Sequence, residues 1–495
     1  MKKYTPIILL LSLVKFSIHL TGNKNYGFHR DELLHLSVSE HLDWGYLEFP
    51  PLIGFIGKIS YWLFDYSLWG VRLFPTLAGI GILILCCLMA VELGGKTKSI
   101  FLAGICVLAF LPFYRNHTLF QPVAFDQLFW TLGFYSLIKY IKTKDLKFLF
   151  LLAITLGLGI MNKYTMAIWG WGILLGLLFY EKGKLYKNKW LYEAGLISLL
   201  IILLNLRWQF LNDFPILQHL QALKEKHLDQ INPFAFGLEQ LTFPFTLTIS
   251  IIGLAAFIFD QKIKKYRSIG IAALVTFITL WILQSKAYYV FAIYPVLFAS
   301  GSVMIEKLMK KRPALIYGVA AFILLPVIPY IPKLTPLLPI YTYIKNYNKE
   351  EVEGRVSLTG DYADMFGWEE QVSLVDSLYQ SLSDRDQKNC VIWGENYGEA
   401  GALKILGKKY GLPNPISRHG SFWLWGFGNR EANVWISLGN EKPSVEYVFE
   451  EVELVKMITH KYAIEEENNI PLYLCRKPKI NIEKWWMDYR KHIFD

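Results

Sequence analysis

Long apolar stretches recur along the first two thirds of the chain, separated by short polar segments. Stretches of this kind are typical of helices that cross a bilayer, each of which needs about 20 apolar residues. The pattern therefore predicts a polytopic helical membrane protein. Several stretches are short, which leaves the count open between about ten and thirteen. We expect eleven spans, near residues 5–21, 69–93, 100–114, 126–141, 147–162, 165–180, 191–206, 241–259, 269–284, 288–305 and 313–330.

The last 150 or so residues have a different pattern, in which helix-like and strand-like segments alternate. We expect helices over 376–382 and 399–410, the second ended by Gly411, and strands over 390–393 and 434–437. This alternation is typical of an α/β domain. The predicted fold is thus mainly α: a transmembrane helical bundle over 1–340, whose first outer loop is 22–68, followed by an extracytoplasmic α/β domain over 341–495. No phosphate-binding glycine loop or nucleophile elbow is visible there.

The charges change the picture in two ways. The formal net charge of +10 is spread over short basic clusters between apolar runs, so membrane topology explains it better than nucleic acid does. With a cytoplasmic N-terminus, the inside segments carry about twice as many Lys and Arg residues as the outside loops. The positive-inside rule then predicts a plasma (inner) membrane protein with the first loop and the C-terminal domain outside. Lys2 and Lys3 precede an apolar run without a small-residue cleavage pattern, so we expect an uncleaved anchor.

The five cysteines and one aromatic run leave alternatives open. Cys86, Cys87 and Cys106 lie in apolar spans, where packing is the expected role. Cys390 and Cys475 could pair only if their domain is extracytoplasmic. The aromatic run 421–426 could be a binding surface, although core or membrane-interface packing is the expected role.

The first outer loop carries the candidate chemistry. Carboxylates at a bilayer boundary are costly and are rarely kept for packing alone. Residues 31–42 predict a short amphipathic helix on the membrane, with Asp31 either as its N-cap or as a functional group. Glu48 is held by the following Pro50-Pro51, which can open another helix toward Trp62. His29 and His35 flank Asp31, but no recognised ligand spacing is present, so no metal or other cofactor is expected.

At this point the residues resemble GT-C glycosyltransferases of the protein O-mannosyltransferase and lipid A aminoarabinose transferase type. The resemblance covers most of the chain. It implies a membrane enzyme that takes a sugar from a polyprenyl-phosphate donor and transfers it, with inversion, to an acceptor hydroxyl on a lipid, glycan or protein outside the cytoplasm. The matching runs are Asp31-Glu32, Trp44-Gly45-Tyr46-Leu47-Glu48-Phe49-Pro50-Pro51-Leu52, Phe125-Asp126-Gln127-Leu128-Phe129-Trp130, Met161-Asn162-Lys163-Tyr164-Thr165, Asn205-Leu206-Arg207-Trp208, Ser285-Lys286-Ala287-Tyr288-Tyr289 with Tyr294-Pro295, and Trp393-Gly394-Glu395-Asn396-Tyr397-Gly398 with Tyr410-Gly411-Leu412-Pro413.

The resemblance also implies roles for residues. Asp31 matches the catalytic aspartate, a general base for the acceptor hydroxyl, and Glu48 matches the second acidic position, where it could orient the acceptor or the sugar. Asp31 and Glu48 are thus the predicted catalytic residues. Cations at the outer ends of spans would stabilise the charge that grows on the leaving phosphate, against an alternative in which they only anchor their helices. For Asp126 a helix cap is the alternative. The predicted residues for binding the donor phosphate or sugar are Glu32, Tyr46, Arg72, Asp126, Lys163, Arg207, Lys286 and Tyr289.

Two departures leave the sugar open: the aminoarabinose transferases carry a lysine where Phe49 stands and an arginine where Leu34 stands. A transporter or flippase of a lipid-linked glycan is the alternative function, since it would also be polytopic. Such a protein should show ionisable residues or broken helices near the span centres, often in repeated halves. In this sequence the charges gather at one face of the predicted bundle, which favours the transferase.

Overall fold

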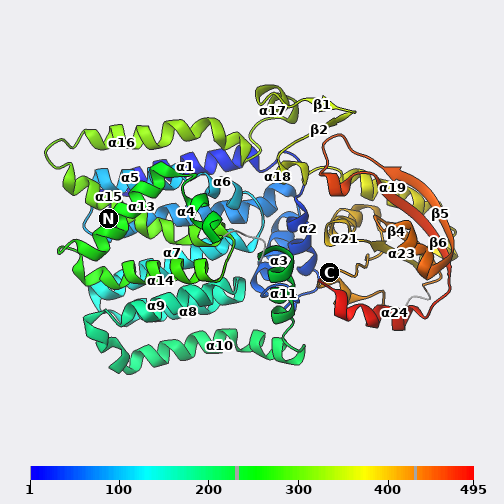
Figure 1. Cartoon of the computed structure of the whole chain (residues 1–495), viewed down its shortest axis with the longest axis horizontal. Helices are drawn as coiled ribbons and strands as arrows, with labels where there is room; N and C mark the ends of the chain where they lie inside the picture. Colours follow the sequence, from blue (N-terminus) through cyan, green and yellow to red (C-terminus); the bar gives the residue numbers. More distant parts are fainter. Residues whose placement is uncertain (1, 229–232, 429–431, 495) are drawn as a thin grey trace. The chain divides into compact units, whose positions relative to one another are not determined.

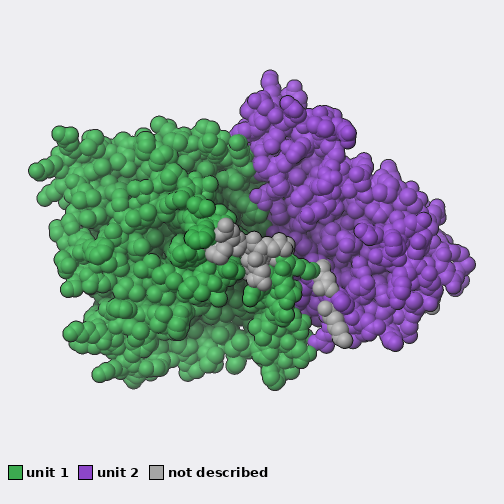
Figure 2. Space-filling model, in the orientation of Figure 1, with its two compact units in different colours: residues 1–23, 49–53, 72–337 green, residues 24–48, 54–71, 338–495 purple. Residues whose placement is uncertain are grey.

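The computed structural model describes residues 2–228, 233–428 and 432–494, and Figure 1 shows its helices and strands. The chain forms two compact units, coloured separately in Figure 2. Unit 1 contains residues 1–23, 49–53 and 72–337, and unit 2 contains residues 24–48, 54–71 and 338–495. The division therefore differs from the predicted one, because most of the first outer loop groups with the C-terminal residues.

Each of the eleven predicted spans corresponds to an apolar helix, all but the start of α4 within unit 1. Among the described residues, six helical stretches are long and apolar enough to cross a bilayer alone, or seven if α12 and α13, bent by 100°, form one span. The mainly helical membrane fold is confirmed, while the count of eleven stays a prediction. The helices are α1 (Thr5–Gly22), α4 (Leu68–Glu92), α5 (Thr97–Ala109), α7 (Pro122–Thr143), α8 (Leu146–Asn162), α9 (Thr165–Leu177), α10 (Lys189–Leu211), α13 (Pro244–Phe259), α14 (Arg267–Ile282), α15 (Tyr294–Leu308) and α16 (Leu315–Leu324).

Shorter helices connect these elements. They are α6 (Pro112–Asn116), η1 (Glu181–Lys187), α11 (Pro215–Leu223), η2 (Lys224–Leu228), α12 (Pro233–Gln240), η3 (Lys264–Tyr266), η4 (Ala287–Ile293) and η5 (Leu325–Lys333).

Small residues allow the apolar helices of unit 1 to pack closely. Helix α13 lies against α15, α9 against α14, and α8 against both α7 and α10. At the α13–α15 crossing, a Cβ added to Gly253 would lie 2.1 Å from the Leu297 carbonyl oxygen, and one added to Gly301 would lie 2.1 Å from that of Ile249. Close backbone approach of this kind supplies packing energy where water cannot drive helix association.

Unit 2 combines two helices from the start of the chain with a small sheet. Helix α2 (Arg30–Val38) packs on α21 (Tyr397–Ile405). Its residues 32–38 are all buried, so the predicted amphipathic helix lying on the membrane over 31–42 is wrong in both its extent and its exposed face. Helix α3 (Leu52–Phe64) follows Pro50-Pro51, as the proline pair predicted.

The main sheet of unit 2 has the strand order β3-β4-β6-β5. Strands β3 (Cys390–Gly394) and β4 (Val434–Leu438) are parallel, with Val391 opposite Trp435. Strand β6 (Ile470–Pro478) runs antiparallel to both β4 and β5 (Phe449–Ile458). Helices α19 (Trp368–Gln380) and α21 pack on β4 and β3 respectively. Trp393, Trp435 and Trp485 form an edge-to-face aromatic core here.

The remaining elements of unit 2 are short. They are α17 (Ile340–Asn346), β1 (Glu351–Val352), β2 (Arg355–Val356), α18 (Gly360–Ala363), α20 (Asp384–Asn389), η6 (Gly407–Tyr410), α22 (Phe422–Trp425), α23 (Lys442–Val448), η7 (Glu465–Glu467), α24 (Ile482–Asp488) and η8 (Tyr489–His492).

The α/β character of the C-terminal region is confirmed, and so are both predicted strands. The helix predicted over 376–382 begins earlier, at Trp368, and ends at Gln380. The helix predicted over 399–410 is α21 followed by the 3-10 helix η6, which ends at Gly411 with φ +73° as expected. Cys390 and Cys475, both within the described part of the chain, are buried and are not joined by a disulfide.

Candidate active site

Asp31 lies in the first turn of α2, and its neighbours hold the helix end. His29 is the N-cap: its imidazole accepts a hydrogen bond from the Asp31 N–H at 3.1 Å. Glu32 completes a capping box by accepting from the His29 N–H at 3.0 Å. The alternative reading of Asp31 as the N-cap is therefore wrong. Its carboxylate is partly exposed and still benefits from the positive end of the helix dipole.

A tyrosine from the C-terminal region holds the Asp31 carboxylate. The Tyr397 hydroxyl donates a hydrogen bond to Asp31 Oδ1 at 3.1 Å. Burial raises the pKa of Tyr397, and the nearby Asp31 carboxylate raises it further. Tyr397 therefore remains a neutral donor at physiological pH. Tyr397 belongs to a run that the sequence comparison had singled out, but its contact with Asp31 had no local signal.

Helix α2 is fixed within unit 2 by an ion pair and by close packing. The Arg30 guanidinium lies 2.6 Å from Asp364 Oδ2 and 2.9 Å from Glu466 Oε2. The Arg30 backbone N–H donates to Asp364 Oδ1. A Cβ added to Gly401 of α21 would lie 2.9 Å from the Leu33 side chain, so the two helices meet closely. These contacts hold the first turn of α2, which carries Asp31, in place within unit 2.

Glu48 is bound on both carboxylate oxygens by Ser421. Oε1 accepts from the Ser421 N–H at 2.8 Å, and Oε2 accepts from its hydroxyl at 2.5 Å. The same hydroxyl accepts from the Leu47 N–H, which closes the loop. Gly420, with φ +53°, is required because an added Cβ would lie 1.6 Å from Glu48 Oε1. Burial raises the pKa of Glu48, and the Ser421 hydrogen bonds oppose that shift. Sequence reasoning missed this partner, although it had singled out the run that contains Ser421.

Tyr46 has a structural contact of its own. It is 1% exposed, and its hydroxyl donates to the carbonyl oxygens of Val38 at 3.0 Å and His41 at 3.2 Å, just after α2. The Tyr46 hydroxyl and the Glu32 carboxylate are both hydrogen-bonded to other protein groups. The predicted donor-binding roles of these two residues stay predictions.

In unit 1 four predicted residues come together. Lys163 follows the last residue of α8, and its Nζ lies 4.1 Å from the centre of the Tyr289 ring. Lys163 also interacts electrostatically with Asp126 and Lys286. Asp126 is 3% exposed and accepts from Trp130 Nε1 at 3.0 Å and from Thr165 Oγ1 at 2.8 Å. Gln121 is the N-cap of α7, so the alternative of Asp126 as a helix cap is wrong.

The two remaining predicted residues lie in different environments. Arg72 is wholly buried in α4, where its carbonyl oxygen accepts from Asn23 Nδ2 and Thr76 Oγ1. Arg207 is exposed near the end of α10. Among the described residues, no group of three or more His, Cys, Asp or Glu side chains is arranged to hold a metal ion.

Comparisons with known proteins give matches at the level of a family model and of the fold. The family model of dolichyl-phosphate-mannose-protein mannosyltransferases matches residues 48–208, a stretch that includes Glu48, Asp126, Lys163 and Arg207. No curated protein sequence gives a significant match.

Solved structures resemble nearly the whole chain. ArnT from Cupriavidus metallidurans bound to undecaprenyl phosphate is 12% identical, with a TM-score of 0.59 over 96% of this chain and 98% of that one. The Archaeoglobus fulgidus oligosaccharyltransferase in complex with Zn and sulfate is 11% identical, with a TM-score of 0.54 over 87% of this chain and 67% of that one. The archaeal oligosaccharyltransferase AglB from Archaeoglobus fulgidus, in complex with an inhibitory peptide and a dolichol-phosphate, is 10% identical, with a TM-score of 0.50 over 88% of this chain and 69% of that one. The GT-C-like fold and the resemblance to this class of membrane glycosyltransferases are confirmed.

Proposed function

We propose that the protein transfers a sugar from a polyprenyl-phosphate donor to an acceptor hydroxyl on the extracytoplasmic side of the membrane, with inversion at the anomeric carbon. The family model and the shared fold support a transferase of this class. The lipid phosphates in the solved ArnT and AglB structures support a polyprenyl-phosphate donor. The distribution of Lys and Arg supports an inner-membrane protein with a cytoplasmic N-terminus.

The position of Asp31 carries the proposal. A general base must be a carboxylate that is fixed in place and can still reach a substrate proton. Asp31 is partly exposed, and His29 rather than Asp31 caps the start of α2. Asp31 accepts a hydrogen bond from the Tyr397 hydroxyl and lies on a helix that Arg30 anchors. Among the predicted acidic residues, Glu48 has both oxygens bonded to Ser421, and Asp126 is buried.

The chemical step is a single displacement. The acceptor oxygen forms a bond to the anomeric carbon while the bond from that carbon to the phosphate oxygen breaks. The acceptor proton moves to the Asp31 carboxylate, and the electron pair of the broken bond leaves with the polyprenyl phosphate. One base and no covalent intermediate give inversion. Glu48 acts as a positioning residue by fixing the loop that follows α2.

The leaving phosphate gains negative charge during the step and needs cations. Lys163 and Lys286 are the proposed partners, because they interact with each other and Lys163 is oriented by Tyr289 and Asp126. Two like charges held close together favour a doubly charged anion between them. Arg72 and Arg207 stay predicted donor-binding residues of lower priority, since one is buried and the other exposed on α10.

Mass spectrometry of lipid-linked sugars and envelope glycans in a deletion strain tests the function. We expect a polyprenyl-phosphate sugar to accumulate and the same sugar to be missing from one surface glycan, lipid or protein. Wild-type protein should reverse both changes, whereas Asp31→Asn should reverse neither although it reaches the membrane in equal amount. Unchanged lipid-linked sugars and glycans in the deletion strain would contradict the proposal.

A further inference from the structure

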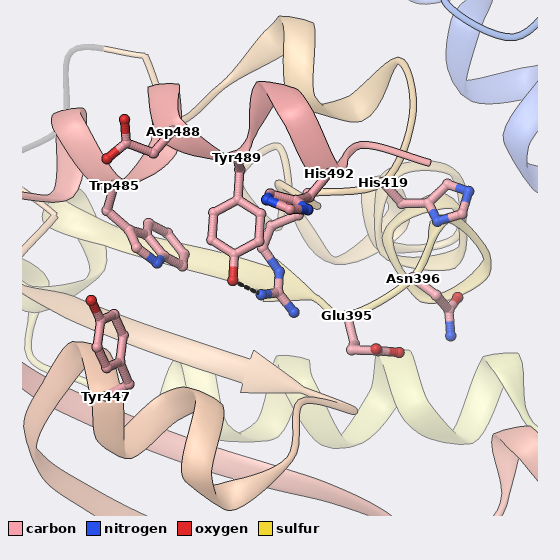
Figure 3. Close-up of a pocket in the computed structure, with 9 residues that line it drawn as sticks. Glu395, Asn396, His419, Tyr447, Trp485, Asp488, Tyr489 and His492 are labelled. Carbon is pink, nitrogen blue, oxygen red and sulfur yellow. Dashed lines mark hydrogen bonds between the residues drawn. The ribbon is translucent and has the colours of Figure 1, made fainter. Parts of the chain in front are cut away.

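Unit 2 contains a pocket of about 630 Å³ that the proposed reaction does not use. Figure 3 shows Trp485 and Tyr447 on one side, Asn396 and His419 on the other, and Tyr489 between them. The residues come from the loop after β3, from the loop before α22, and from α23, α24 and η8. The volume lies in the range of about 300–1,000 Å³ that is usual for small-molecule sites.

The wall of this pocket is both aromatic and built to stay in place. The Arg418 guanidinium carbon lies 4.5 Å from the centre of the Tyr489 ring and 5.1 Å from that of Trp393. Its Nη1 also donates a hydrogen bond to the Tyr489 hydroxyl, drawn as the dashed line in Figure 3. Trp485 packs edge-to-face on Trp393 and lies against Tyr489. Arg418 is thus part of a preformed wall and is already engaged by aromatic side chains.

The charges in the lining argue against an anionic ligand. Glu395 and Asp488 both line the pocket, and Arg418 is the only Lys or Arg among its lining residues. With neutral histidines, the lining therefore has a net negative charge, which disfavours a phosphate or another carboxylate. The Glu395 and Asp488 carboxylates and the imidazole of His419 are hydrogen-bonding groups suited to a ligand rich in hydroxyls. The Asn396 amide lines the same pocket but caps α21 and donates to Glu467. Such a lining is equally unsuited to a purely apolar ligand.

Sugars combine the two properties that this lining matches. Their hydroxyls hydrogen-bond to carboxylates, amides and imidazoles, while their C–H faces carry partial positive charge and stack on the negative faces of aromatic rings. The exposed Tyr447 ring and the Trp485 indole offer such faces. A volume of about 630 Å³ leaves room for more than one sugar ring.

The pocket is connected to both acidic residues of the candidate active site through its own lining. The His419 ring lies 4.9 Å from the ring of Tyr397, whose hydroxyl binds Asp31. Two residues after His419, Ser421 binds Glu48. The pocket is therefore linked to the proposed base through two side chains in contact, those of His419 and Tyr397.

From this geometry we propose that the pocket binds a saccharide portion of the acceptor, neutral or bearing an amine, and so selects a glycan or glycolipid acceptor. This inference rests on the proposed function, because it assigns the pocket to the acceptor of the same reaction. It also narrows that function, since a peptide acceptor would not need the site.

The test uses the purified full chain, the polyprenyl-phosphate sugar that accumulates in the deletion strain, and the lipid and glycan extract of that strain's envelope as acceptor. Two variants change the pocket: Tyr447→Ala removes an exposed stacking face, and Asp488→Asn removes a hydrogen-bonding charge. Tyr341→Ala is the matched control, because Tyr341 is also exposed, lies in unit 2 and does not line the pocket. The acceptor extract is used untreated, after protease digestion and after periodate oxidation, which cleaves vicinal diols of sugars.

We expect each pocket variant to raise the KM for the extract by at least about fivefold, with the donor KM and kcat within about twofold of wild type. Tyr341→Ala should match wild type in all three. The extract should keep its acceptor activity after protease and lose it after periodate. Unchanged acceptor KM values in both pocket variants, or an acceptor that resists periodate and is destroyed by protease, would overturn the inference while leaving sugar transfer intact. Absence of any transfer by wild-type protein would instead remove the proposed function, and the inference with it.

Discussion

Asp31 and Glu48 lie in the same predicted loop, yet the structure treats the two carboxylates differently. Asp31 stands in the first turn of a helix, partly exposed, and accepts from the Tyr397 hydroxyl. Glu48 is bonded on both oxygens to one serine, with a glycine removing every side-chain atom from its path. One carboxylate can exchange its protein partner for a substrate hydroxyl, and the other is built into the loop. Under the proposed function, the two acidic residues of this loop therefore take different tasks, chemistry for Asp31 and positioning for Glu48.

Substitution of Asp31 should have the largest effect and therefore tests the difference between Asp31 and Glu48 most strongly. Asp31→Asn should lower kcat for transfer by about 10²–10⁴-fold, since an amide cannot take up the acceptor proton. The capping box of His29 and Glu32 should keep α2 folded, so expression and membrane insertion should equal those of wild type. Transfer by purified protein from a labelled donor lipid measures the effect. A kcat within about threefold of wild type would contradict the assignment.

The effect at Glu48 should be smaller. Glu48→Gln can still accept from the Ser421 N–H and can donate to the Ser421 hydroxyl, so the loop should keep its shape. We expect a loss of about tenfold or less in kcat, consistent with weaker, uncharged hydrogen bonds. Ser421→Ala, measured beside it, should give a loss of similar size, because it removes the hydroxyl that bonds to Glu48 Oε2 and Leu47 N–H but keeps the backbone N–H bond to Glu48 Oε1. A defect as large as that of Asp31→Asn would place Glu48 in the chemical step.

Tyr397→Phe tests the role of the hydroxyl that bonds to Asp31. The change removes one hydrogen bond and keeps the ring that packs against His419. A loss of about three- to tenfold in kcat is expected, with the donor KM unchanged, because a less fixed base reaches the productive geometry less often. Steady-state kinetics with varied donor separate the two parameters. A change confined to the donor KM would show that Tyr397 serves binding instead.

The smallest effect concerns stability and a third carboxylate, that of Glu467. Burial raises the pKa of Glu467 to about 7, whereas about 4.3 is usual in an unfolded chain. A raised pKa means that the stability contributed by this group is full below about pH 4 and is lost as the pH rises through about 7. At pH 8 wild-type protein therefore carries a buried charge that Glu467→Gln lacks. The variant amide can also donate to Gln371 Oε1, an atom for which the described residues supply no hydrogen-bond partner.

We accordingly expect Glu467→Gln to raise the unfolding temperature by a few degrees at pH 8, and the gain to shrink by pH 5.5. Tryptophan fluorescence during thermal unfolding reports it, because unit 2 has a tryptophan core. Glu450→Gln, at an exposed position on β5, is the matched control and should change little at either pH. A gain that is equal at both pH values would show that charge is not the cause.

Much of the fold could be predicted because its signals are local. Apolar runs marked each of the six described helical stretches that are long and apolar enough to cross a bilayer alone. Strands β3 and β4 are short, fully buried runs that alternation with helices made visible. Strand β5 had no such signal: between its two buried end residues it is almost entirely exposed, and charged residues occupy positions that alternation would have made apolar. Only its pairing with β6 makes it a strand.

The candidate site also contains residues that the sequence could predict and residues that it could not. Asp31 and Glu48 could be named from a local motif, and the Lys163 cluster from similar runs. Their partners could not, since Tyr397 and Ser421 lie more than 360 residues away along the chain, and no pattern in the sequence records which side chain meets which carboxylate. The capping role of His29 was also missed, because N-cap patterns are built on Ser, Thr, Asp and Asn.

Chemical rescue of the base tests the central claim most directly. Asp31→Ala should leave space for a small carboxylate where the side chain stood, so sodium formate should restore part of the lost transfer rate in proportion to its concentration. Glu48→Ala, assayed in parallel, should not respond, because its defect lies in the shape of the loop. Rescue of Asp31→Ala alone is the result that this account predicts. Rescue of Glu48→Ala without rescue of Asp31→Ala would contradict it and make Glu48 the base.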